Sequence, residues 1–236
     1  MSFLLDGRVR HDQPVAGHRT GIEPVLLAAS IPARTGERIL EGGTGSGAAL
    51  LCVAHRVPGI TGLGLEIDPA MAALAGANGA ANGFGALEFL ATDLTAWRTG
   101  ARFDHAMANP PWHAAGASAS PDAGKDRARR AAPGLFAAWA AALARPLRHR
   151  GTLTFVIAAA HADAALAAIA DAGCGSLAML PLWPRAGVAA RLVLLRGIKG
   201  GRGPFRLLPG LVLHAPDGGF TDEAQTILRD GAALAL

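Results

Sequence analysis

The amino-acid sequence predicts an α/β fold built on an open, doubly wound and mostly parallel sheet. Short apolar segments typical of strands alternate with alanine-rich segments typical of helices, and two strand-like segments near the C-terminus form an apparent hairpin. A glycine-rich turn follows the first core strand, and carboxylates stand at or just after the ends of three expected strands. Polar residues at this edge of a parallel sheet indicate a ligand site.

The first core strand, 38–41, ends in Glu41 and leads through the glycine-rich turn 42–47 into a helix expected over 48–56. Glycines allow the backbone to turn tightly and to approach a ligand closely. The spacing G-x-G-x-G differs from the dinucleotide fingerprint G-x-G-x-x-G. A flexible turn is the alternative interpretation, but the position between a strand and a helix favours a ligand-binding loop.

The second strand, 62–66, ends in Glu66 about twenty residues after the glycine-rich turn, where such folds place an acid that binds ribose. Asp68 is the expected N-cap of the next helix and Pro69 its first residue, and this helix is expected to end near Asn82. A helix cap or a surface charge is the alternative role for each carboxylate, but the position at a strand end favours a role in binding.

The next two strands lead to further site candidates. Strand 87–90 leads to Asp93, and strand 103–108 runs into the tetrapeptide Asn109-Pro110-Pro111-Trp112. The two prolines stiffen this turn, and the Asn109 amide and the Pro110 carbonyl are acceptors that can face one amino group. The Trp112 indole offers a flat apolar face to a planar substrate. The alternative is an ordinary loop in which Trp112 only packs.

The other segments complete the sheet within a single expected domain, 1–236. This domain consists of an N-terminal extension, 1–31, with a short strand or hairpin and then a helix, and of a core, 34–236. The remaining expected core elements are helices over 134–147 and 160–172, a buried strand over 151–157, and the hairpin strands 177–182 and 190–196.

Composition limits the class of protein. Hydrophobic residues make up 51% and charged residues 17% of the chain, which excludes wholesale disorder. Cys52 and Cys174 lack the spacing of metal ligands, so we expect reduced core thiols in a cytoplasmic protein without a metal. The N-terminus is too short and too soon charged for a signal peptide, and the alanine-rich run 135–147 is too short to span a membrane.

The chain is basic, with a formal net charge of +4 and an isoelectric point near 10.0. This balance favours a polyanionic partner, although a solvated arginine surface explains it equally well. A sharper feature is the cluster Lys125-Asp126-Arg127-Ala128-Arg129-Arg130 within the polar stretch 113–133. A loop of this length is unusual in a compact domain, so we interpret it as a lid that orders around substrate.

In their order and spacing, the glycine-rich turn, the carboxylates and the Asn-Pro-Pro-Trp turn resemble the class I S-adenosylmethionine-dependent methyltransferases. The chain is most similar to their Asn-Pro-Pro-aromatic branch, and within it to the tRNA(Val) adenine-N6 methyltransferases. The lead-in 17–28 and the segment Gly219-Phe220-Thr221 resemble that narrower group. Glu41 in place of aspartate, Gly42 in place of an apolar residue, and Trp112 in place of tyrosine or phenylalanine depart from it.

The resemblance implies a Rossmann-like sheet of seven strands with an antiparallel last strand, and S-adenosylmethionine as the cofactor. It implies that Glu66 binds the ribose hydroxyls, that Asp93 binds the adenine amino group, and that Glu41 organises the glycine-rich turn or reaches the cofactor ammonium through water. The expected cofactor-binding residues are Glu41, Gly43, Thr44, Gly45, Gly47, Glu66, Ile67, Asp93, Leu94 and Asn109. The expected catalytic residues are Asn109, Pro110, Pro111 and Trp112, and the expected substrate contacts are Arg19, Trp112, Arg127, Arg129 and Arg130.

These features predict N-methylation, and the resemblance implies adenine-N6 methylation of tRNA by a cytoplasmic enzyme without a metal. Methylation of a protein glutamine or of guanine N2 in ribosomal RNA are alternatives with the same chemistry. A non-catalytic RNA- or protein-binding module is a third alternative, which the intact Asn-Pro-Pro-Trp turn disfavours. The sequence shows no separate N-terminal helical domain of the kind that release-factor glutamine enzymes carry, which favours RNA over protein as the substrate. The sequence does not indicate an oligomeric state.

Overall fold

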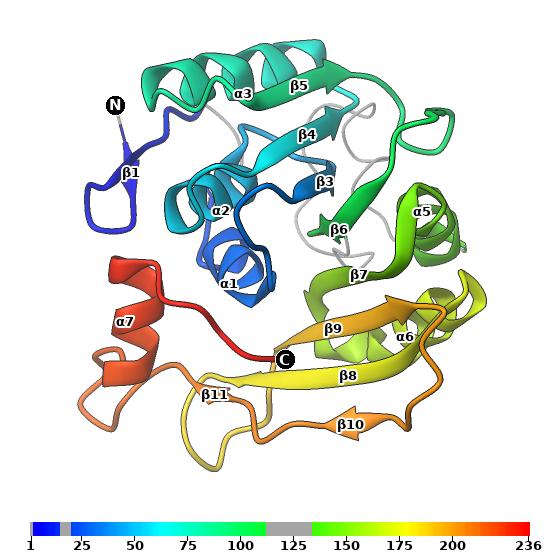
Figure 1. Cartoon of the computed structure of the whole chain (residues 1–236). Helices are drawn as coiled ribbons and strands as arrows, with labels where there is room; N and C mark the ends of the chain where they lie inside the picture. The colour runs from blue at the N-terminus through cyan, green and yellow to red at the C-terminus, as the bar shows by residue number, and fades with distance from the viewer. Residues whose placement is uncertain (1, 15–19, 112–133) are drawn as a thin grey trace, which may run out of the picture.

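The computed structural model describes residues 2–14, 20–111 and 134–236, which form a mixed α/β structure around one large sheet (Figure 1). Within these residues the sheet has nine strands, and the last two strands are two residues long. The strands are β3 (Arg38–Gly42), β4 (Thr61–Glu66), β5 (Leu87–Ala91), β6 (Phe103–Ala108), β7 (Leu147–Ala158), β8 (Cys174–Trp183), β9 (Leu192–Lys199), β10 (Arg206–Leu207) and β11 (Leu211–Val212). A separate antiparallel hairpin consists of β1 (Phe3–Leu4) and β2 (Val9–Arg10).

The seven long strands of the described sheet lie in the order β5-β4-β3-β6-β7-β9-β8. Neighbouring strands from β5 to β7 run parallel, whereas β9 runs antiparallel to both β7 and β8. The short strands β10 and β11 pair with β8 on the side away from β9. The expected Rossmann-like sheet with an antiparallel last strand is therefore confirmed.

Helices cover both faces of the sheet, so the fold is doubly wound (Figure 1). Successive residues of β7 alternate between two hydrophobic clusters, because side chains along a strand point to opposite faces. Val156 packs with α1, α2 and α7, and Phe155 packs with α5 and α6. The helices are α1 (Glu23–Ser30), α2 (Ala48–Arg56), α3 (Pro69–Ala81), α5 (Leu135–Ala144), α6 (Ala162–Asp171) and α7 (Asp222–Asp230), with a 3-10 turn, η1 (Ala159–His161).

The differences from the expected elements have local causes. Helix α5 ends before Pro146, which has no N–H to continue it, and β7 begins at Leu147 instead of 151. Helix α7 was not expected, although its ends carry clear signals. The Thr221 hydroxyl accepts a hydrogen bond from the first turn, and Gly231 closes the helix in a left-handed conformation. Among the described residues no helix is long and apolar enough to cross a membrane.

Candidate active site

The carboxyl ends of four neighbouring parallel strands bring the candidate residues to one edge of the sheet. Gly42, the last residue of β3, lies between Leu65 of β4 and Ala108 of β6. Strands β4 and β5 end side by side, at Glu66 and Ala91. The glycine-rich turn therefore occupies the middle of this edge, between the loops that follow β4 and β5 and the turn that follows β6.

The glycine-rich turn needs glycine at two of its positions because of both conformation and space. Gly43 has a φ of +63°, and a Cβ atom there would lie 2.7 Å from the Trp139 ring. Gly47 has a φ of +91° and is the N-cap of α2, and a Cβ atom there would lie 3.3 Å from the Phe89 ring. The turn consequently presents backbone at the start of α2, where N–H groups without helical partners can bind ligand oxygens.

Glu41 is buried beside the glycine-rich turn and accepts a hydrogen bond from it. Its side chain is 4% exposed, and the Thr44 hydroxyl donates a hydrogen bond of 2.6 Å to its Oε2. Burial raises the pKa of Glu41 to about 8, and the nearby Glu66 carboxylate acts in the same direction. The neighbouring Gly42 leaves no room for a side chain, because a Cβ atom there would lie 2.8 Å from a Leu94 methyl.

Glu66 joins the glycine-rich turn to the next loop. Its carboxylate accepts hydrogen bonds from Gly45 N at 2.8 Å and from Asp68 N at 3.0 Å. The following Ile67 side chain is 66% exposed. This pair presents carboxylate oxygens and an apolar surface side by side.

Asp93 is exposed in the loop after β5, and its Oδ1 accepts hydrogen bonds from Thr95 N at 2.7 Å and Thr95 Oγ1 at 2.8 Å. The hydrogen bonds from the Thr95 side chain and backbone lower the pKa of this carboxyl group below its ordinary value. The carboxylate therefore stays ionised at neutral pH. The next residue, Leu94, is buried at 6% exposure and packs beside the glycine-rich turn.

The turn after β6 begins with a half-buried asparagine. Asn109 follows the last residue of β6, Pro110 is buried, and Pro111 is half-buried. The Asn109 side chain forms no hydrogen bond with any residue in the described ranges. The expected site residues Arg19, Trp112, Arg127, Arg129 and Arg130 lie outside the described residues.

The structure adds contacts that the sequence did not suggest. His11, from the segment after β2, is fully buried, and its Nε2 lies 2.7 Å from Ser46 Oγ in the glycine-rich turn. Asn78 of α3 donates a hydrogen bond of 3.0 Å to the Ser46 carbonyl and is itself 2% exposed. Two buried polar residues, one from the N-terminal segment and one from α3, thus contact Ser46 and hold the turn. The sequence signal that was available for these contacts is an asparagine, Asn78, inside an alanine-rich helix.

Cys52 in α2 and Cys174 at the start of β8 are buried free thiols. Burial raises the pKa of Cys52 to about 12, and the nearby Glu41 carboxylate acts in the same direction. A thiol in this state is unreactive at neutral pH. In the described ranges, no group of three or more His, Cys, Asp and Glu residues is arranged to hold a metal ion.

Comparison with known proteins shows which family the chain matches. The methyltransferase small domain family matches residues 20–168, which is more than half of the chain. A tRNA1(Val) (adenine(37)-N6)-methyltransferase from Aeromonas hydrophila is 30% identical over 216 residues, which cover 91% of this chain and 89% of that protein. A protein of the same name from Bacteroides thetaiotaomicron is 31% identical over 66% of this chain and 65% of its own length.

The fold has a similar solved structure. A predicted O-methyltransferase from Agrobacterium tumefaciens matches with a TM-score of 0.75 at 25% identity, covering 91% of this chain and 99% of that chain. The expected resemblance is thereby confirmed: the chain belongs to the methyltransferase small domain family and is an S-adenosylmethionine-dependent methyltransferase.

Proposed function

We propose that this methyltransferase transfers the methyl group to the N6 amino group of an adenine in tRNA, in the cytoplasm. The observation that carries the proposal is the turn after β6, where Asn109 and Pro110 stand at the same edge as Glu66 and Asp93. The Asn109 side chain forms no hydrogen bond within the described residues, so its amide oxygen is available to a substrate.

Two acceptors suit an amino group better than a hydroxyl. The lone pair of an adenine amino nitrogen is delocalised into the ring, which makes the nitrogen a poor nucleophile. Asn109 Oδ1 and the Pro110 carbonyl would each accept one of its two hydrogens and draw the nitrogen toward tetrahedral geometry. The lone pair would then point at the methyl group, with the reacting atoms about 3–3.5 Å apart. A hydroxyl acceptor has one hydrogen and would leave one of these oxygens without a partner.

The residues of the neighbouring loops would hold the cofactor. S-Adenosylmethionine supplies a methyl group on a sulfonium centre and requires no metal. Glu66 would accept hydrogen bonds from the ribose hydroxyls, and Asp93 would accept one from the adenine amino group. The exposed Ile67 would cover the adenine ring. Gly43, Thr44, Gly45, Gly47 and Leu94 would shape the remainder of the cofactor site, and Glu41 would support the turn.

The substrate class rests on the relatives and on charge. A relative that matches 91% of this chain carries the name of a tRNA adenine-N6 methyltransferase. We propose that Trp112 stacks on the target base, a contact worth roughly 1–3 kcal/mol in single-strand recognition. Arg19, Arg127, Arg129 and Arg130 would neutralise phosphates nearby. Methylation of a protein glutamine or of guanine N2 would use the same two acceptors. The experiment below tests these substrates together with tRNA.

Labelled cofactor, incubated with unmodified total tRNA, ribosomal RNA and total protein, tests this proposal directly. We expect the label in N6-methyladenosine after digestion of the tRNA to nucleosides. Asn109→Ala should lower the single-turnover rate on the order of 10²-fold, as removal of one transition-state hydrogen bond does. Its affinity for the cofactor should stay close to that of the wild type.

Asp93→Ala serves as the matched variant from the same edge. It should weaken cofactor binding measured by calorimetry, and its single-turnover rate should recover at saturating cofactor. Label in protein or in guanosine would replace the substrate assignment. A wild-type single-turnover rate in Asn109→Ala would remove the proposed role of this residue.

A further inference from the structure

The C-terminal part of the sheet is strongly basic. Residues 172–216 contain six Lys or Arg and no Asp or Glu, whereas the whole chain has a formal net charge of only +4. Four of these residues are exposed and form no ion pair with a described residue: Arg185, Arg191, Arg202 and Arg206. The segment therefore concentrates positive charge on one side of a molecule whose remaining residues are slightly acidic in sum.

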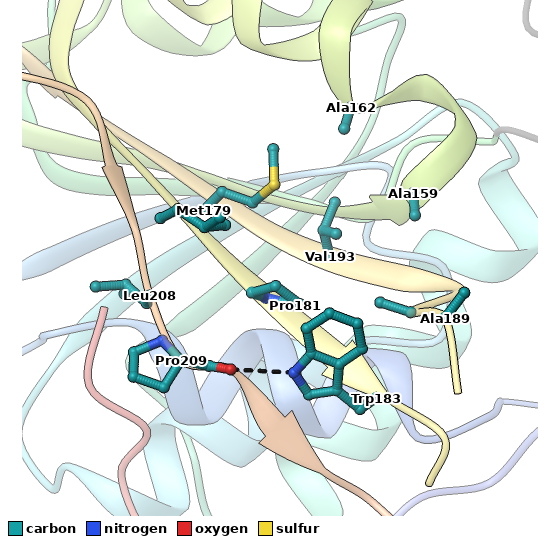
Figure 2. Close-up of a pocket in the computed structure, with 11 residues that line it drawn as sticks. Ala159, Ala162, Met179, Pro181, Trp183, Ala189, Val193, Leu208 and Pro209 are labelled. Carbon is teal, nitrogen blue, oxygen red and sulfur yellow. Dashed lines mark hydrogen bonds between the residues drawn. The ribbon is translucent and has the colours of Figure 1, made fainter. Parts of the chain in front are cut away.

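An apolar cavity of about 650 Å³ opens within this segment (Figure 2). Its volume lies in the range of about 300–1,000 Å³ that is typical of small-molecule sites. Strands β8 and β9, the start of α6 and the segment around β10 contribute its walls. The lining includes Met179, Pro181, Trp183, Val193, Leu207 and Leu208.

The cavity exists because Pro181 interrupts strand pairing. The carbonyls of Met179 and Trp183 accept hydrogen bonds of 2.8 Å from Leu208 N and Leu213 N, so these β8 residues direct their backbone groups toward β10 and β11. Pro181 lies between them with the same orientation and has no N–H to donate. The chain from β10 to β11 therefore cannot pair continuously with β8, and an apolar wall stays open between the two short strands.

Trp183 forms a flat wall of the cavity. Its indole N–H donates a hydrogen bond of 3.0 Å to the Pro209 carbonyl, which fixes the ring and satisfies its polar atom (Figure 2). The cavity rim is also apolar: Leu207 is 65% exposed, and Val188 in the adjoining turn is 45% exposed. A fixed indole ring beside a turn that carries Arg185 and Arg191 is the combination that binds unpaired nucleotides without sequence preference.

The cavity lies on the same edge of the sheet as the candidate active site. The turn between β8 and β9 returns at this edge, and Ala159 N, just after β7, donates a hydrogen bond of 2.9 Å to the Arg191 carbonyl. Strand β7 is the direct neighbour of β6, which leads into Asn109. Three strand spacings of about 4.8 Å separate β8, which carries Trp183, from β6, so one bound chain of nucleotides can reach both places.

We propose that substrate RNA extends from the active site across this surface, with an unpaired nucleotide in the cavity against Trp183 and phosphates at Arg185 and Arg191, which flank the cavity in the turn between β8 and β9. The inference rests on the proposed function, because it assumes an RNA substrate. Apolar side chains of a protein partner would also fit the cavity, but they would not use the exposed arginines. The positive charge therefore selects a polyanion.

Binding of unmodified tRNA transcript at several salt concentrations tests the surface. The variant Arg185→Gln/Arg191→Gln should flatten the dependence of log affinity on log salt by about 0.7 for each single-strand phosphate that it no longer neutralises. The matched control is Arg34→Gln/Arg102→Gln. These two arginines are exposed at the opposite edge of the sheet, and the control removes the same net charge. The control should keep the wild-type slope.

Two variants of Trp183 separate stacking from simple packing. Trp183→Leu keeps an apolar side chain without a ring and should weaken tRNA binding roughly 5- to 150-fold, which corresponds to a stacking contact of about 1–3 kcal/mol. Trp183→Phe keeps a ring and should restore most of the affinity. Melting temperature and cofactor affinity, measured for every variant, identify any that fail to fold.

The outcomes distinguish this inference from the proposed function. Wild-type protein that neither binds nor methylates tRNA would overturn the proposed function and this surface with it. Wild-type protein that methylates tRNA, together with equal salt slopes for Arg185→Gln/Arg191→Gln and its control, would overturn the surface alone. Equal affinities of folded Trp183→Leu and Trp183→Phe would exclude a stacked nucleotide and leave the cavity to another occupant.

Discussion

Single residues at the catalytic edge show how far the fold controls ionisation. Burial raises the pKa of Glu41 to about 8 in the folded protein, whereas the pKa of a glutamate in an unfolded chain is about 4.3. Between these values the folded protein holds a proton that the unfolded chain has released. The free energy of unfolding should therefore fall as pH rises through this interval, with a slope of at most about 1.4 kcal/mol per pH unit.

Glu41→Gln removes this titration and keeps an oxygen that accepts the Thr44 hydroxyl. We expect the variant to lack the decline in the free energy of unfolding between pH 5 and 8, measured by urea denaturation without cofactor. Glu88→Gln, an exposed glutamate on β5, is the matched control and should reproduce the wild-type profile. The same decline in Glu41→Gln would show that other groups cause it.

At the scale of elements, two asparagines hydrogen-bond the N-terminal segment 10–12 to α3. Asn78 lies within this helix and Asn82 is its C-cap. Asn82 exchanges hydrogen bonds of 2.9 and 2.7 Å with the backbone of Arg10, and Asn78 exchanges two of 2.9 Å with the backbone of Asp12. Four residues of a helix span about 6 Å along its axis, and two residues of an extended chain span about 6.7 Å. The spacing of Asn78 and Asn82 therefore matches that of Asp12 and Arg10.

These two asparagines give a matched pair of variants. Asn78→Ala and Asn82→Ala should each lower the free energy of unfolding by about 1–3 kcal/mol, because each leaves buried or part-buried backbone groups without partners. Asn78 also binds the Ser46 carbonyl in the glycine-rich turn, so Asn78→Ala should weaken cofactor binding in calorimetry more than Asn82→Ala does. Equal cofactor affinities would show that the N-terminal strand does not position the turn.

The elements that sequence could predict are those with local signals. The Asp68 side chain accepts hydrogen bonds at the start of α3 and Pro69 is its first residue, as expected, because capping depends on neighbouring residues. The contact between His11 and Ser46 spans 35 residues, and that between Asn78 and Asp12 spans 66, so only the tertiary structure reveals them. The cavity at Pro181 likewise depends on pairing among three strands. The two-residue strands β10 and β11 carry too short a pattern to detect.

At the scale of the whole molecule, two regions carry the positive charge that RNA binding would use. One is the basic surface beside β8, and the other is the sequence cluster of Arg127, Arg129 and Arg130. If one RNA occupies both regions, each neutralised phosphate adds to the same release of counterions. If the regions serve different partners, only one of them affects the salt dependence of tRNA binding.

Neutralising both regions together therefore tests whether they form one binding surface. The Arg127→Gln/Arg129→Gln/Arg130→Gln variant should flatten the salt dependence of tRNA binding by about 0.7 for each phosphate that it no longer neutralises, and leave cofactor affinity unchanged. Combined with the substitutions at Arg185 and Arg191, its effect on the slope should be the sum of the two separate effects. A combined slope equal to that of either variant alone would contradict a continuous surface, because the second region would then neutralise no phosphates of the same RNA.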